Sequence, residues 1–97
     1  MIFAELTERP NVEKILKVLD KGFGDIEWGD QGTAENPDAY FWIKRRGVTV
    51  AVDNLTSLEF QVKCARDDAP LIQEVINVLA KTFGVKVYDE PEYEAHE

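Results

Sequence analysis

The fold is decided by residues 10–28, PNVEKILKVLDKGFGDIEW, and by residues 70–88, PLIQEVINVLAKTFGVKVY, which align with each other without a gap. The identical aligned pairs are Pro10 with Pro70, Val18 with Val78, Leu19 with Leu79, Lys21 with Lys81, Phe23 with Phe83 and Gly24 with Gly84. Such a match indicates a supersecondary unit that is used twice, by duplication or by convergence. Either origin gives a strand, a helix and a returning strand, and this unit buries the apolar side of its helix against a sheet.

Both segments show the apolar spacing of an amphipathic helix. The apolar positions of the first expected helix are Val12, Ile15, Leu16, Leu19 and Phe23. Those of the second are Leu71, Ile72, Val75, Ile76, Leu79 and Phe83. Pro10 suits the start of the first helix and Gly24 its end, while Asp67 or Asp68 is the candidate N-cap of the second. Because each helix is apolar on one side, both are expected to cover a sheet.

Most of the remaining chain is predicted to form strands. Residues 58–64, LEFQVKC, alternate apolar and polar without a break, and residues 48–53, VTVAVD, alternate in the same way. Alternation is typical of a strand with one face buried and one face in water, so it favours an antiparallel sheet with an open face. Shorter strands are expected at residues 2–6, 26–28 and 85–88.

Residues 40–44 and 48–53 form a predicted hairpin whose register stays open. A three-residue loop of residues 45–47 places Tyr40 and Trp42 in the core, with glycine at the third loop position. A two-residue Arg46-Gly47 turn shifts the pairing by one residue and leaves Tyr40 and Trp42 on the open face. The two registers have different functional consequences, because only the second exposes these aromatic rings to a partner.

The bulk properties indicate one acidic domain. With 97 residues and 44% hydrophobic content, the chain can bury a single core. The formal net charge is -8, and residues 89–97 contain five acids without a lysine or arginine. We therefore expect one α+β domain over residues 1–88 and an acidic C-terminal tail over residues 89–97. The charge argues against direct nucleic-acid binding, which needs a basic surface, and it suits a basic partner.

The sequence also lacks the signals of export and of membrane insertion. No stretch reaches the roughly 18 consecutive apolar residues of a membrane span, and Cys64 is the only cysteine. A lone cysteine excludes an internal disulfide. The expected location is the cytoplasm, without a membrane partner.

Residues that catalyse or bind metals are scarce. His96 is the only histidine and lies near the chain end, so no Ser-His, Cys-His or multi-histidine site is expected. Cys64 stands at one of the alternating apolar positions of residues 58–64, so we predict that it is an inert core residue. Residues 28–38 offer oxygen ligands for calcium but lack the spacing of an EF-hand, which favours a polar loop. We expect no enzymatic activity, no cofactor and no metal.

Together these patterns predict an α+β fold. The sheet is expected to have five or six mainly antiparallel strands with two helices on one face, in the order β-α-β, hairpin, β-α-β. Two split β-α-β units form a ferredoxin-like core, in which the hairpin of residues 40–53 is an insertion. Such folds host many unrelated functions, so the architecture does not assign one.

The expected function is that of a small acidic protein-interaction module that binds a separate and basic protein. An inhibitor or an immunity-type partner is one form that such a module takes. The alternative is a small-molecule-binding or regulatory domain that acts as a homodimer. The basic cluster Lys44-Arg45-Arg46 at the hairpin tip either keeps this end of the molecule soluble or anchors an anionic group. The candidate partner-binding residues are Tyr40, Trp42, Lys44, Arg45, Arg46, Thr49, Glu59, Gln61 and Lys63.

Overall fold

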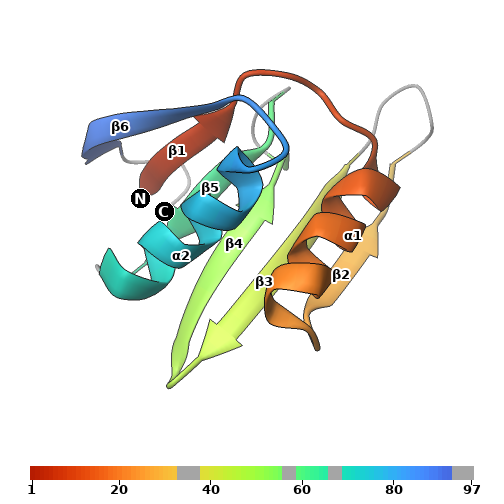
Figure 1. Cartoon of the computed structure of the whole chain (residues 1–97), viewed down its shortest axis with the longest axis horizontal. Coiled ribbons are helices and arrows are strands. Elements are labelled where there is room, and N and C mark those ends of the chain that lie inside the picture. Colours follow the sequence, from red (N-terminus) through yellow and green to blue (C-terminus); the bar gives the residue numbers. More distant parts are fainter. Residues whose placement is uncertain (33–37, 56–58, 66–68, 93–97) are drawn as a thin grey trace.

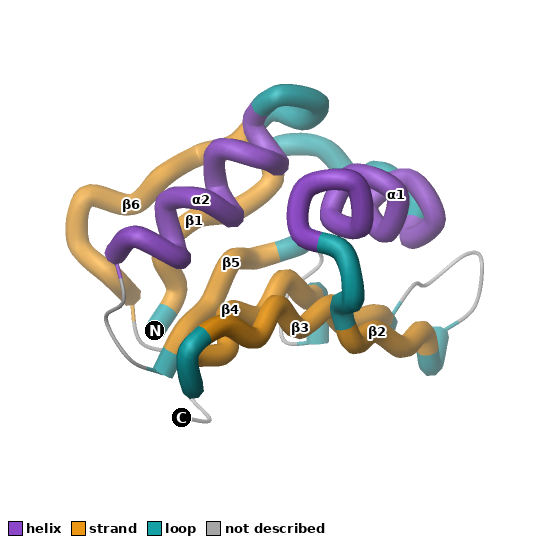
Figure 2. The backbone as a smooth tube through the Cα atoms, turned by 60° about the horizontal axis from the view of Figure 1, so that its bottom comes forward, coloured by secondary structure: helices purple, strands orange, loops and turns teal. Residues whose placement is uncertain are grey.

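Six strands form one sheet in the order β2-β3-β4-β5-β1-β6, and every pair of neighbours is antiparallel. The computed structural model describes residues 1–32, 38–55, 59–65 and 69–92. The strands are β1 (Ile2–Leu6), β2 (Glu27–Asp30), β3 (Ala39–Arg45), β4 (Val48–Asp53), β5 (Gln61–Cys64) and β6 (Val85–Glu92). Helix α1 (Val12–Phe23) follows β1 and helix α2 (Ala69–Ala80) follows β5. Both helices lie on the same face of the sheet (Figures 1 and 2), which confirms the predicted α+β class.

The first turn and the last turn of α1 are closed by local hydrogen bonds. Asn11 is the N-cap, and its side-chain oxygen accepts a hydrogen bond of 2.8 Å from the Lys14 backbone N–H. Gly24 follows the helix at φ 65°, and its N–H donates to the Asp20 carbonyl at 2.8 Å. A positive φ is accessible to glycine without steric cost, so the predicted helix end at Gly24 is confirmed.

The aligned repeat occupies equivalent core positions in the two helices. Ile15 and Leu19 of α1 are fully buried, and so are their counterparts Val75 and Leu79 in α2. The backbone after each helix differs, because Gly84 has no positive φ and instead lies close to the Thr7 side chain. The candidate N-caps Asp67 and Asp68 lie outside the described residues. The alignment therefore predicts the buried side of both helices, but not the way each helix ends.

The hairpin adopts the two-residue turn. Arg45 pairs with Val48, which leaves Arg46 and Gly47 as the turn residues at φ 53° and 78°. Two consecutive residues at positive φ are typical of a type I′ turn, whose twist matches that of the flanking strands. In this register Phe41 and Ile43 of β3 are fully buried. Tyr40 and Trp42 alternate with these core residues, so they lie on the face of the sheet that the helices leave uncovered.

The core fills the layer between the sheet and the helices. Helix α1 packs over β3, whereas α2 packs over β4, β5 and β6. Cys64 is 3% exposed and belongs to this core, as its parity predicted. The largest fully buried side chains are Phe41, Phe60, Leu6, Ile15, Leu19, Ile43, Leu79, Val50, Val52, Val62 and Val75.

Two strands differ from their predicted form. Strand β6 runs to Glu92, where it pairs with Ile2 of β1, so it extends four residues beyond the predicted end at residue 88. Strand β5 is buried on both sides, and the prediction that its polar face lies in water is wrong. Its polar residues on this face contact side chains of both neighbouring strands: Lys63 forms a buried ion pair with Asp53 of β4, and Gln61 donates to Glu5 of β1.

Candidate functional site

Aromatic rings form a strip on the helix-free face of the sheet, where β2 and β3 lie side by side. We use the name aromatic strip for Tyr40, Trp42 and Lys44 of β3 together with Gly29 of β2. The ring centroids of Tyr40 and Trp42 are 4.6 Å apart, with an angle of 32° between the ring planes. The Lys44 ammonium lies 5.5 Å from the centroid of the Trp42 ring. Trp42 stays 36% exposed, so part of its large apolar ring remains accessible to a partner.

Gly29 allows the Tyr40 ring to lie over the edge strand. The two residues are direct cross-strand partners, and a Cβ at Gly29 would lie 2.8 Å from atoms of that ring. Any larger residue at this position would displace the ring. Because Gly29 has no side chain, the Tyr40 ring can cover β2, and the aromatic strip therefore extends to the edge of the sheet.

Acidic side chains line strand β2 on both of its faces, and we call them the acidic border. Glu27 and Asp30 are exposed at its two ends, and Asp25, which precedes the strand, is exposed too. Lys44 and Glu27 form an ion pair with an N···O distance of 3.1 Å. Only Glu27 shares the face of the aromatic strip, because Asp30 is the cross-strand partner of the buried Ala39 and points to the helix side.

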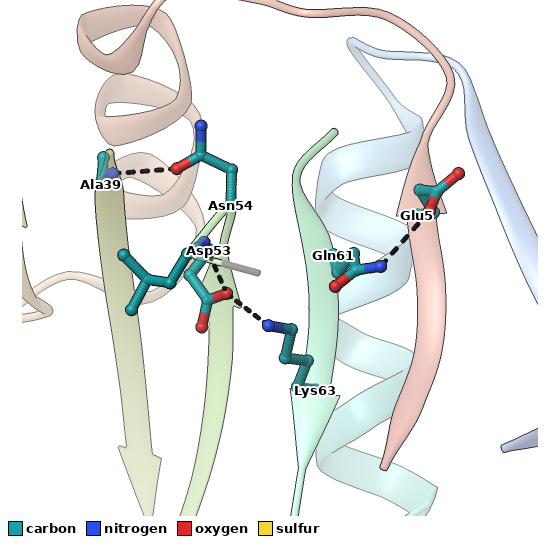
Figure 3. A network of polar contacts seen from close by, with 7 residues as sticks. Glu5, Ala39, Asp53, Asn54, Gln61 and Lys63 are labelled. Atoms are coloured by element: carbon teal, nitrogen blue, oxygen red, sulfur yellow. Dashed lines mark hydrogen bonds and ion pairs between the residues drawn. The ribbon is translucent and has the colours of Figure 1, made fainter. Parts of the chain in front are cut away.

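A buried ion pair lies further along the same face, between β4 and β5. Lys63 Nζ donates to Asp53 Oδ1 at 2.6 Å, and the two residues are 5% and 6% exposed. Figure 3 shows Lys63 reaching across from β5 to Asp53 on β4. Charges at this depth are tolerated because each one neutralises the other. The pair joins two central strands and has little surface left for a partner.

Gln61 connects this region to β1. Its Nε2 donates to Glu5 Oε2 at 3.4 Å, and the Tyr88 hydroxyl donates to the same carboxylate oxygen at 3.3 Å. Gln61 is 8% exposed, and its Oε1 is the only buried side-chain polar atom of the described residues without a hydrogen-bond partner. The contacts on the Glu5 carboxylate thus link three strands, β5, β1 and β6.

Asn54 extends the pairing of β3 and β4 by one residue. Its side-chain oxygen accepts from the Ala39 N–H at 2.9 Å, and its own N–H donates to the Ala39 carbonyl at 3.3 Å. These two bonds, of which Figure 3 draws the one to the Asn54 side chain, hold the beginning of β3 directly before Tyr40. They help to keep the aromatic strip in its register.

The structure brings four of the nine predicted partner-binding residues together on an accessible face. Tyr40, Trp42, Lys44 and Thr49 lie on the helix-free side, and Thr49 is the cross-strand neighbour of Lys44. Gln61 and Lys63 share this side but are almost completely buried. For these two residues, a direct role in binding would need the face to open.

The remaining three predicted residues lie elsewhere. Arg45 points to the helix side, where its Nη2 donates to the Phe23 carbonyl at 2.7 Å and closes the C-terminal end of α1. Arg46 is exposed at the turn. Glu59 precedes β5 and accepts two hydrogen bonds from Arg9, at 3.1 and 2.9 Å. The basic cluster is therefore split between the two sides of the hairpin and is not a continuous patch.

Sequence reasoning missed two contributors to the site. Gly29 carries a detectable signal, since a glycine inside a strand marks a close approach of another group. Asp53 carries a weaker one, because a carboxylate at the polar parity of a predicted strand is normally assigned to water. In both cases the missing information was the cross-strand partner.

The described residues offer no cluster suited to metal chemistry. Within these residues, no three Asp, Glu, His or Cys side chains gather closely enough to hold a metal ion. His96 lies outside the described residues. None of the helices in the described part of the chain has the length and hydropathy needed to span a bilayer.

Comparison of the chain with protein-family models, with curated proteins and with solved structures found no match. The functional assignment therefore depends on the aromatic strip and its acidic border.

Proposed function

We propose that this chain is a small, acidic, non-enzymatic protein-interaction module that binds a basic protein through the aromatic strip. The observation that carries the proposal is the exposed Trp42, whose ring packs at a tilt against Tyr40 beside the acidic border of β2. Tryptophan, tyrosine and arginine dominate the binding energy of protein interfaces, so an accessible Trp-Tyr pair is a strong anchor.

The chemistry of the aromatic strip favours a cationic partner. A lysine or arginine above an aromatic ring gains about 0.5–1 kcal/mol at an exposed site and about 2 kcal/mol when water is excluded. Two further exposed carboxylates, Asp25 before β2 and Asp30 on its helix-facing side, add longer-range electrostatic attraction. A formal net charge of -8 also accelerates the encounter with a basic protein, most strongly at low salt. An inhibitor or an immunity-type partner of a basic target would use these features.

The finer description of the architecture is a proposal as well. We interpret the fold as a ferredoxin-like core with an inserted hairpin. In support, removal of β3 and β4 from the strand order leaves β2-β5-β1-β6, in which each helix connects two strands that are not neighbours. A cytoplasmic location likewise remains an inference from sequence, with the single, buried Cys64 as its support.

A photocrosslinking experiment tests the proposed function. The photoreactive amino acid p-benzoylphenylalanine is introduced at position 42 or, as a matched control, at position 17 on the exposed side of α1. After irradiation in the source cells, we expect an adduct from position 42 only. Mass spectrometry of that adduct should identify a partner segment rich in lysine or arginine. Equal adducts from both positions, an acidic partner segment, or no adduct from position 42 would overturn the proposal.

A further inference from the structure

Among the described residues, strand β2 is an edge of the sheet and has no strand on its outer side. In the described residues its only hydrogen-bonded neighbour is β3, and Figure 1 shows no labelled element beyond it on the outer side. An edge strand presents backbone groups that can pair with another extended chain. Addition of a strand at such an edge is a recurring mode of peptide recognition.

The register shows which backbone groups of β2 face outward. The Gln31 N–H donates to the Asp38 carbonyl at 2.8 Å, so these residues are a hydrogen-bonded pair of the antiparallel ladder. Hydrogen-bonded and non-hydrogen-bonded pairs alternate along the ladder. Gly29 therefore bonds inward to Tyr40, whereas the N–H and C=O groups of Trp28 and Asp30 point away from β3.

The side chains around this edge favour a basic partner strand. On the helix-free face, Glu27 and the Tyr40 ring above Gly29 lie where alternate residues of an added strand would stand. A carboxylate and an aromatic face both attract lysine or arginine. On the helix side, Trp28 is 48% exposed and stacks on Phe41 with 6.4 Å between ring centroids, so it offers a place for an apolar residue.

A second copy of this chain fits the same edge poorly. Two β2 strands side by side would bring the exposed Glu27 and Asp30 of one copy close to those of the other. Like charges on paired strands are destabilising. The charge of the edge thus selects a partner of opposite sign.

We propose that β2 binds an extended, basic segment of the partner as a seventh strand of the sheet. This inference rests on the proposed function and specifies its mode of binding. In this arrangement the outward N–H and C=O groups of Trp28 and Asp30 pair with the partner backbone. Lysine or arginine residues of the segment contact Glu27 and Tyr40, and its apolar residues contact Trp28.

A synthetic octapeptide of alternating lysine and valine serves as the probe, and an octapeptide of alternating glutamate and valine is its control. The two peptides have the same spacing of valine and opposite charge. In amide NMR spectra of the full chain, we expect the lysine peptide to shift the Trp28 and Asp30 signals and to slow exchange of these two amide protons. Equal shifts from both peptides, shifts confined to other elements, or no shift at these amides would overturn the proposal.

The contribution of the backbone is tested with Asp30→Pro and its matched control Asp30→Ala. Both variants lose the carboxylate and its hydrogen bond to the Gly32 N–H, but only the proline variant also loses the outward N–H. We expect Asp30→Pro to bind the lysine peptide at least about tenfold more weakly than Asp30→Ala. Equal affinity of these two variants would show that the edge is not used.

Two methylated versions of the lysine peptide repeat the test on the intact chain, so that it does not depend on the folding of a variant. One version carries methyl groups on the backbone nitrogens of its valines, and the other carries them on the backbone nitrogens of its lysines. Alternate N–H groups of a strand point to opposite edges, so one version should lose binding and the other should retain it. Equal binding by both versions would contradict strand addition.

Trp42→Ala separates the edge from the aromatic strip, with the photocrosslinked partner as ligand. Loss of partner binding in Trp42→Ala with equal binding by Asp30→Pro and Asp30→Ala would leave the proposed function standing and overturn the edge proposal. Unchanged partner binding by Trp42→Ala, together with weaker binding by Asp30→Pro than by Asp30→Ala, would support the edge proposal. That result would overturn the aromatic strip as the binding surface.

Discussion

At the scale of single residues, a side chain's neighbours across the sheet matter more than its place in the sequence pattern. Lys63 and Thr49 both occupy polar positions of alternating strands, yet Lys63 is buried and Thr49 is exposed. Lys63 finds a carboxylate within 2.6 Å, which neutralises its charge in the interior. Removal of one partner of such a pair leaves an uncompensated buried charge.

We predict that Lys63→Met destabilises the fold by about 3–5 kcal/mol, because it keeps a long apolar side chain but removes the ammonium that faces Asp53. The double variant Lys63→Met with Asp53→Asn should recover a large part of this loss, since neither residue is then charged. Urea unfolding followed by circular dichroism measures both effects. A cost below about 1 kcal/mol for Lys63→Met, or no recovery in the double variant, would show that the pair does not hold β4 to β5.

At the scale of elements, the hairpin turn decides which residues of β3 face the helices. The Arg46-Gly47 turn places both residues at positive φ. Arginine is an unusual choice there, whereas Asn-Gly is the preferred pair for this type of turn. The turn therefore has a suboptimal first residue and a favourable second one.

We expect Arg46→Asn to stabilise the protein by about 0.5–1 kcal/mol, because asparagine adopts a positive φ more easily. Gly47→Ala should destabilise it by about 1–2 kcal/mol, the cost of a left-handed conformation for an L residue. A Cβ at Gly47 would meet nothing within 4 Å, so this loss comes from backbone conformation and not from a clash. Arg46→Lys is the control without effect. Thermal unfolding of the three variants would contradict this account if Arg46→Asn were the least stable of them.

At the scale of the whole molecule, charge and topology act on the same surface. Both helices cover one face of the sheet (Figure 2), so the other face carries the aromatic strip and the buried polar contacts. If β2 binds a basic segment as proposed, its exposed acids Glu27 and Asp30 would also disfavour the pairing of two copies at this edge.

The chain should therefore be a monomer at physiological ionic strength in light scattering coupled to size exclusion. Salt shortens the Debye length from about 10 Å at 0.1 M to about 3 Å at 1 M, so a dimer that forms through β2 would appear only at high salt. Asp30→Asn should lower the salt concentration at which such a dimer appears. A dimer that is stable at low salt would favour the homodimeric alternative over a separate protein partner.

The sequence by itself determined the class of the fold and the composition of its core. Apolar spacing is a local property, so the two helices and the burial of Ile15, Leu19, Val75 and Leu79 follow from it. Strands β1, β3 and β4 lie within one residue of their predicted bounds, whereas β2, β5 and β6 differ by two to four residues at one end. It also limited the site to a few aromatic and polar residues. The sequence left open whether Tyr40 and Trp42 are core or surface, because both loop lengths agree with the alternation.

Only the tertiary structure decided that question and the order of the strands. The two-residue turn put Phe41 and Ile43 toward the helices and left Trp42 on the other face. The position of β5 between β4 and β1 buried Lys63 beside Asp53, and the pairing of Gly29 with Tyr40 carried the aromatic strip to the edge. The physical reason is that each of these contacts joins residues on different strands, whereas periodicity along a chain reports only which way each side chain points relative to its neighbours in sequence.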